Sequence, residues 1–142
     1  MVSITIYMEP MGKGRPRVWR TKKGQSVTFT PTKTAHAENL IRDKVLELKT
    51  FSPNDIPLVL KATFFRTRPK SLKKSVVLPV SRPDWDNYGK LLCDALEGFL
   101  YANDSQITTA LIKKRFGSPP RIELEIMEEE TEGESQQLKG GE

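Results

Sequence analysis

Apolar and polar side chains alternate in several short stretches of the chain, as they do in β-strands that bury one face. Residues 2–8 set Val, Ile and Met against Ser, Thr and Tyr, and their β-branched content favours a strand. The same reasoning predicts strands over residues 58–67, 106–116 and 121–127, and a hairpin formed by residues 18–19 and 26–30. A Gly-Ser-Pro-Pro turn at residues 117–120 predicts that the last two strands form an antiparallel pair.

Two other segments repeat their apolar residues every three or four positions, which is the spacing of an amphipathic helix. The first runs from residue 32 to about residue 48, with Pro31 near its expected start. Its apolar stripe consists of Ala35, Leu40, Ile41, Val45 and Leu48. The second helix is expected to begin near Asp86 and to end at about Glu97. At roughly 100° per residue its leucines lie opposite Asp86 and Lys90, so these two polar side chains point outward together. Glycine is less favourable than alanine inside a helix by about 1 kcal/mol, so Gly89 would be explained if the second helix started later than residue 86.

The predicted order is three strands, a helix, a strand, a helix and two strands. This order is typical of an α+β domain with a mixed β-sheet and two main helices. The 142 residues, 37% of them hydrophobic, are enough for one domain with its own core, which we expect to span residues 1–127. Residues 128–142 contain six glutamates and little apolar surface, and they predict an acidic disordered tail.

Cys93 is the only cysteine of the chain, which excludes an internal disulfide and favours a reducing compartment. No apolar stretch approaches the roughly 18–20 residues that a membrane span needs. The N-terminus lacks the cationic start and the long apolar core of an export signal. We therefore expect a cytoplasmic protein that does not enter a membrane.

Charge is distributed unevenly along the chain. The formal net charge is +5, but the acidic tail carries −5, which leaves +10 on the first 127 residues. Such a basic body attracts polyanions, so nucleic acid is the leading class of partner, and a solvated surface without a partner is the alternative. The candidate DNA-binding side chains are Lys13, Arg15, Arg17, Arg20, Lys22 and Lys23 in one segment and Arg68, Lys70, Lys73 and Lys74 in another.

Three aspartates are the candidates for chemistry. Asp84 and Asp86 lie one residue apart at the expected start of the second helix, and they project together where the backbone is extended. The alternative is that Asp86 caps this helix. Asp104 lies in the polar turn after the helix, where the returning chain can bring it toward the other two; alone it would be a turn residue. Converging carboxylates destabilise a protein unless a cation joins them, and oxygen ligands of this kind suit Mg²⁺.

These residues occur in a larger pattern. The string Arg82-Pro83-Asp84-Trp85-Asp86-Asn87, followed by Lys90, Asp94-Ala95-Leu96 and Asp104-Ser105-Gln106-Ile107, resembles the signature of the RusA family of Holliday junction resolvases. The segment Gly12-Lys13-Gly14-Arg15-Pro16-Arg17 is similar to the N-terminal basic loop of that family. Together these motifs lie within residues 4–125.

The resemblance implies a homodimeric α+β enzyme, encoded largely by phages and prophages, that acts on DNA in recombination and repair. It implies that the enzyme binds four-way junctions and nicks two opposed strands symmetrically. It also implies that Asp84, Asp86 and Asp104 are metal-binding catalytic carboxylates and that Lys90 has a catalytic role, whereas we interpret Asp94 as structural.

The prediction is therefore a Mg²⁺-dependent endodeoxyribonuclease, with Mn²⁺ as an alternative ion. One or two ions would activate water, and Lys90 would neutralise charge on the phosphate. Two other functions stay open. A non-catalytic nucleic-acid-binding module would use its aspartates as caps and turns, and a broader nuclease would cut flaps or other branched DNA. A histidine-based nuclease is disfavoured because His36, the only histidine, has no partner motif.

Overall fold

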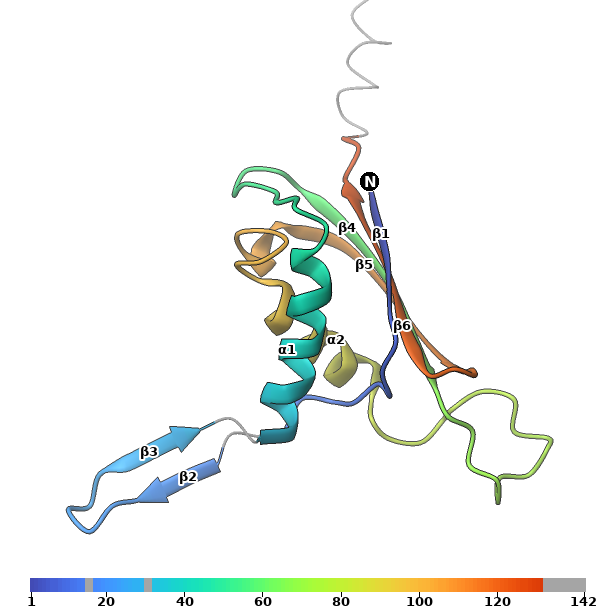
Figure 1. The fold of residues 1–142 in the computed structure, drawn as a ribbon, viewed down its shortest axis with the longest axis horizontal. Coiled ribbons are helices and arrows are strands. Elements are labelled where there is room, and N and C mark those ends of the chain that lie inside the picture. Colours follow the sequence, from blue (N-terminus) through green and yellow to red (C-terminus); the bar gives the residue numbers. More distant parts are fainter. Residues whose placement is uncertain (15–16, 30–31, 132–142) are drawn as a thin grey trace, which may run out of the picture.

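The computed structural model describes residues 1–14, 17–29 and 32–131. Its elements are β1 (Val2–Ile6), β2 (Arg17–Arg20), β3 (Ser26–Phe29), α1 (Thr32–Leu46), β4 (Leu58–Arg66), α2 (Trp85–Leu96), the short 3-10 helix η1 (Asp104–Gln106), β5 (Ile107–Phe116) and β6 (Arg121–Glu128). Four strands form a mixed sheet in the order β1-β6-β4-β5, and both α-helices lie on one face of it (Figure 1). The predicted α+β class and the order of the elements are confirmed.

The interior position of β4 determines the arrangement of the sheet. β4 pairs with β6 in antiparallel and with β5 in parallel orientation, and β1 is antiparallel to β6 at one edge. Parallel pairing of β4 with β5 is feasible because the chain crosses over through α2 between them. The predicted pairing of the last two strands is therefore wrong. The turn at residues 117–120 reverses the chain, but the more buried β4 lies between β5 and β6.

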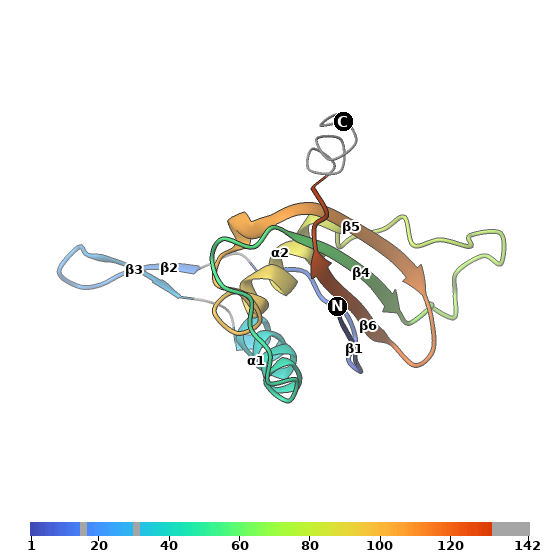
Figure 2. The ribbon, with the colours of Figure 1, turned by 90° about the horizontal axis from the view of Figure 1, so that it is seen from above.

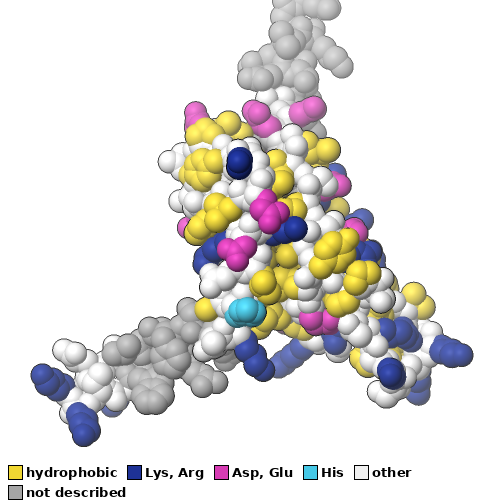
Figure 3. All heavy atoms as spheres, viewed as in Figure 1, with side chains coloured by type: hydrophobic (Ala, Val, Ile, Leu, Met, Phe, Trp, Pro, Cys, Tyr) yellow, Lys and Arg dark blue, Asp and Glu magenta, His cyan; other side chains and the backbone are white. Residues whose placement is uncertain are grey.

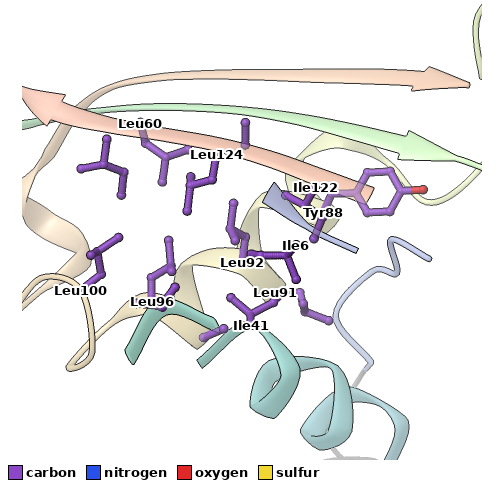
Figure 4. Close-up of a cluster of buried hydrophobic side chains, with 14 of the residues drawn as sticks. Ile6, Ile41, Leu60, Tyr88, Leu91, Leu92, Leu96, Leu100, Ile122 and Leu124 are labelled. Atoms are coloured by element: carbon purple, nitrogen blue, oxygen red, sulfur yellow. The ribbon is translucent and has the colours of Figure 1, made fainter. Parts of the chain in front are cut away.

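The hydrophobic core fills the space between the sheet and the two helices (Figure 4). Its most deeply buried members include Ile41, Leu58, Leu60, Phe64, Leu91, Leu92, Leu96, Ile122 and Leu124. Tyr88 of α2 stacks on Phe64 of β4, with ring centroids 4.8 Å apart. Because the leucines of α2 face the sheet, its opposite side, with Asp86 and Lys90, is exposed to solvent as the helical spacing predicts.

The apolar stripe of α1 is rotated from the predicted one. Thr34, Ala37 and Glu38 are buried beside Ile41 and Val45, whereas Leu40 is 41% exposed. Glu38 can occupy the buried stripe because Lys13 of the N-terminal segment and Arg42 of the same helix compensate its charge, as described below. The helix also ends at Leu46, two residues before the predicted end.

Gly89 lies inside α2, which begins at Trp85, so the helix does not start later to avoid it. A Cβ atom at this position would lie only 2.5 Å from Cδ1 of Ile112 on β5. The close approach of the helix to the sheet therefore explains the glycine. A larger residue would increase the helix propensity at this position, but it would have to displace the Ile112 side chain.

The predicted hairpin is confirmed as β2 and β3, which pair from Arg17 opposite Phe29 to Arg20 opposite Ser26. Gly24 closes its turn with a positive φ of 80°, and its N–H donates to the Thr21 carbonyl (2.9 Å). The hairpin projects away from the sheet and the helices in both views (Figures 1 and 2). It reaches well beyond the body of the molecule, which suits an arm that contacts a large ligand.

The C-terminal part of the chain is described as far as residue 131, with β6 ending at Glu128. Most of the predicted acidic tail, residues 128–142, thus lies outside the described residues. Within the described ranges, no helix combines the length and the apolar character that crossing a bilayer requires.

Candidate active site

Asp84 and Asp86 lie where the long loop after β4 enters α2. Asp84 occupies the N-cap position with extended backbone (φ −70°, ψ 155°), but its side chain makes no capping hydrogen bond. Instead its carbonyl oxygen accepts the N–H groups of Asn87 and Tyr88, both at 3.1 Å. Asp86 is already the second residue of the helix and so does not occupy the cap position. Helix capping therefore explains neither carboxylate.

Both carboxylates border one surface pocket of about 460 Å³. Lys90, one helical turn after Asp86, lines the same pocket, as do Lys13 and Arg82. The ion pairs found among the described residues involve neither Asp84, Asp86 nor Lys90. Two carboxylates and the ammonium group of Lys90 thus face one pocket and are not ion-paired with each other. The carboxylates can bind a cation, and the ammonium group can bind an anionic group of the same ligand.

The ends of two strands hold the backbone immediately before Asp84. Arg66, the last residue of β4, donates from Nη1 to the Ser81 hydroxyl (3.2 Å) and to the Arg82 carbonyl (2.9 Å). Lys114 of β5 donates from Nζ to the Ser81 carbonyl (2.8 Å). Hydrogen bonds from charged donors are stronger than neutral ones, so the sheet anchors this segment although a long loop precedes it.

A glycine-rich segment packs against the other side of the pocket. A Cβ atom on Gly12 would collide with the side-chain amide of Asn87 and would lie 3.1 Å from Cβ of Pro83. The N–H of Lys13 donates to the Asn87 carbonyl (3.3 Å). The absence of a side chain on Gly12 therefore lets this segment lie directly on the residues that flank the two aspartates.

Asp104 lies beside the far end of α2, not in this pocket. The Tyr101 hydroxyl donates to Asp104 Oδ1 (2.7 Å) and also contacts the Cys93 carbonyl (3.3 Å), and the Asp104 N–H donates to Glu97 Oε2 (3.0 Å). Seven residues separate Asp86 from Cys93, which corresponds to roughly 10 Å along the helix. The returning chain does not bring Asp104 toward Asp86 because it turns at the end of the helix and enters β5 there.

The described residues accordingly contain no group of three or more Asp, Glu, His or Cys side chains placed to hold one metal ion. Burial raises the pKa of Asp104 to about 6; Glu97 and Asp94 add to this rise, and the hydrogen bond from Tyr101 opposes it. A nearby cation would favour the ionised carboxylate and lower this pKa again. Asp104 is thus an acid whose charge depends on what binds beside it.

The predicted DNA-binding residues fall into three groups. Arg15 lies outside the described residues, and only the backbone of Arg17 is described. The exposed members are Arg20, Lys22 and Lys23 on the hairpin and Lys70, Lys73 and Lys74 on the loop between β4 and α2. Lys and Arg side chains gather over these two regions, at both ends of the lower edge of the face in Figure 3. The exposed bases therefore lie at both ends of this edge, and further Lys and Arg side chains lie between them in this view.

Two predicted DNA-binding residues are engaged within the protein. Arg68 donates to the carbonyls of Val76 (2.5 Å) and Lys73 (2.7 Å), and its guanidinium lies 5.3 Å from the centre of the Phe116 ring. It thereby holds the loop in shape. Lys13 forms ion pairs with two carboxylates, so its charge is largely neutralised where it stands.

Sequence reasoning missed the residues that support the site. Arg66 and Lys114 carry no signal beyond a base near the end of a strand, and their acceptors are backbone groups far along the chain. Glu38 gave one usable signal: it lies four residues before Arg42, which is ion-pair spacing on a helix, and interrupts the apolar stripe of α1.

Comparison with known proteins shows which family the chain matches. A family model described as "Endodeoxyribonuclease RusA" matches residues 8–127 of the chain. The "Uncharacterized protein YqaN" of Bacillus subtilis (strain 168) is 29% identical over 140 residues, which cover 89% of this chain and 96% of that protein. The match begins before β2, continues into β6, and includes Asp84, Asp86, Lys90 and Asp104.

Proposed function

We propose that this chain, which belongs to the RusA family of endodeoxyribonucleases, resolves four-way DNA junctions by metal-dependent nicks in two opposed strands. The family comprises Holliday junction-resolving nucleases of DNA recombination, which bind branched DNA and generally use divalent metal ions. One observation carries the proposal for this chain. Asp84 and Asp86 share a pocket with Lys90, and none of these three side chains is ion-paired among the residues described.

Asp84 and Asp86 fit the ligand set of Mg²⁺. This ion takes one or two carboxylates from a protein and completes its shell with water and substrate phosphate oxygens, and Mn²⁺ accepts similar ligands. Both side chains are exposed, which leaves space for water and for a phosphate. When bound, the metal lowers the pKa of the attacking water and stabilises the leaving oxygen.

The basic residues of the chain take the remaining roles. Lys90 would neutralise the negative charge that builds up on the scissile phosphate, because it faces the same pocket as the aspartates. The exposed lysines of the hairpin and of the loop before α2 would hold the DNA backbone on either side of the pocket. These phosphate contacts position the junction without reading its sequence.

A homodimer accounts for both the paired nicks and the position of Asp104. A two-fold axis relates two equivalent pockets, which match two equivalent strands of a junction. Asp104 lies too far from the pocket of its own chain to share an ion with Asp86. We therefore assign it to the metal site of the partner subunit, whose Asp84 and Asp86 it would approach across the dimer interface.

Mixing inactive subunits tests this assignment. We expect Asp86→Asn and Asp104→Asn each to lower the cleavage rate about 10³-fold alone, and their mixture to recover up to about one quarter of the wild-type rate. In a mixed dimer one shared site contains both substitutions, and the other contains neither. Single-turnover cleavage of a labelled junction measures the recovery after the subunits have been unfolded and refolded together.

Refolded wild-type protein and each variant refolded alone are the controls. A mixture as inactive as its parents, with mixed dimers demonstrated by two affinity tags, would place Asp104 in the site of its own chain or in a purely structural turn.

A further inference from the structure

The ammonium group of Lys13 lies between the two helices, although its neighbours along the chain suggest a DNA-binding loop. Lys13 Nζ is 2.5 Å from Glu38 Oε1 of α1 and 3.0 Å from Asp94 Oδ2 of α2, and its side chain is only 16% exposed. Burial lowers the pKa of Lys13, but hydrogen bonds to the two carboxylates outweigh it and raise the pKa above its ordinary value. Lys13 thus remains charged, and although it borders the pocket of Asp84 and Asp86, its ammonium group is paired with the carboxylates of Glu38 and Asp94.

Arg42 completes this ion cluster, which consists of Lys13, Glu38, Arg42 and Asp94. Its Nη2 donates to Glu38 Oε2 (3.2 Å) and to the Asp94 carbonyl (3.0 Å), while Nε donates to the Ala95 carbonyl (3.2 Å). Two cations and two carboxylates therefore balance where the N-terminal segment, α1 and α2 meet. A partly buried cluster of this kind favours one arrangement of its elements, because each charge is satisfied only in that arrangement.

The ion cluster lies at the root of the β2–β3 hairpin. The chain leaves the body for the hairpin after Gly14 and returns to it at Thr32, the first residue of α1. The Gly14 N–H donates to Thr34 Oγ1 (3.0 Å), which joins the outgoing segment to the returning one. The N–H of Lys13 donates to the Asn87 carbonyl, one residue after Asp86. The root of the hairpin is thus tied both to α1 and to the border of the aspartate pocket.

We propose that Lys13 is a positioning residue, held by Glu38 and Asp94, that fixes the hairpin relative to the Asp84–Asp86 pocket and makes no phosphate contact of its own. The proposal rests on the proposed junction-cutting function. A phosphate approaching Lys13 would have to displace two carboxylates that repel it, whereas Lys22 and Lys23 at the hairpin tip are exposed.

The geometry gives this role a consequence for cleavage. The hairpin projects from the body, so a small rotation at its root moves its basic tip by a larger distance (Figure 1). If the tip holds one DNA phosphate, the orientation of the root selects which other phosphate reaches the pocket. Positioning errors of about 1 Å can lower a rate about 10²-fold, so loss of the ion cluster should change the place and the rate of cutting.

The test compares Lys13→Gln and Asp94→Asn with Lys22→Gln. In the first two variants we expect nicks to spread to neighbouring phosphates, and the rate at the wild-type position to fall about 10- to 100-fold at saturating enzyme. The dependence of junction affinity on salt should keep its wild-type slope in Lys13→Gln. In Lys22→Gln the slope should decrease by about one, because a phosphate contact is lost. Asp94 is at the rim of the cluster, so its variant serves even if Lys13→Gln fails to fold.

Hydrogen exchange supplies a readout that needs no DNA. The amides of Lys13 and Gly14 should exchange about tenfold faster in Asp94→Asn than in the wild type. The control is Glu47→Gln, which removes an exposed ion pair between Glu47, just after the end of α1, and Lys44 of α1, and which should change neither exchange nor nick position. If the wild type cuts no junction, the proposed function fails, and the exchange measurement still decides whether Asp94 holds the root.

Two results would overturn the proposal. One is a Lys13→Gln enzyme that loses about one unit of salt slope and still cuts at the wild-type position, which would make Lys13 a phosphate contact. The other is an Asp94→Asn protein whose exchange at Lys13 and Gly14 matches the wild type.

Discussion

Asp86→Asn should lower the rate of junction cleavage by about 10³-fold while the affinity for the junction stays within about threefold of the wild type. The substitution keeps the size of the side chain and removes the charge that attracts a cation. Asp86 is exposed and lies in none of the described ion pairs, so folding does not depend on its charge. Single-turnover cleavage at saturating enzyme measures the rate, and fluorescence anisotropy in EDTA measures the affinity.

Asp84→Asn should behave in the same way, because Asp84 borders the same pocket and makes no capping hydrogen bond that the substitution could disturb. Asp43→Asn is the matched control, since Asp43 is an exposed aspartate on α1 that does not line the pocket. A loss of binding and of folding together in the Asp84 and Asp86 variants would instead assign these carboxylates a structural role.

Leu92→Ala should reduce the free energy of unfolding by about 3–5 kcal/mol. Leu92 is completely buried between α2 and the sheet, so truncation leaves a cavity in addition to the lost apolar contact. Natural domains are stable by only about 5–15 kcal/mol, and the loss is therefore a large part of the total. Chemical denaturation followed by circular dichroism measures it.

Leu111→Ala provides the comparison for this substitution. Leu111 lies on β5 and is 45% exposed, so the same truncation there should reduce the free energy of unfolding by less than about 1 kcal/mol. Equal losses at the two positions would mean that α2 does not pack on the sheet as described. The position of the aspartate pocket would then be wrong as well, because α2 carries it.

Local periodicity was sufficient to predict where the elements lie along the chain, although in α1 the buried side is rotated from the predicted one because Glu38 is buried with ionic partners. The hairpin, both helices and the exposed position of Asp86 and Lys90 follow from this spacing. The order of the strands within the sheet does not follow from the spacing. The turn at residues 117–120 indicates only that the chain reverses, and the place between β5 and β6 belongs to β4, whose buried side chains are brought there by long-range packing.

The candidate site shows the same limit. The residue types and the spacing predicted that Asp84 and Asp86 lie together, since they are neighbours along the chain. Their relation to Asp104 depends on the length and direction of α2, and the twelve residues of this helix carry the chain about 18 Å away before it turns. Lys13 was predicted to bind DNA because the sequence shows a positive charge among other basic residues. Its two carboxylate partners come from other elements and become visible only in the fold.

The most direct measurement is to map the nicks on a synthetic four-way junction labelled in each strand in turn, with Mg²⁺ and with EDTA, beside a flap and a linear duplex of the same sequence. We expect two nicks at symmetric positions in opposed strands of the junction, only with Mg²⁺, and none of comparable rate in the flap or the duplex. Junction binding without cleavage, unchanged by EDTA, would contradict the assignment of Asp84 and Asp86 to a metal-dependent nuclease site.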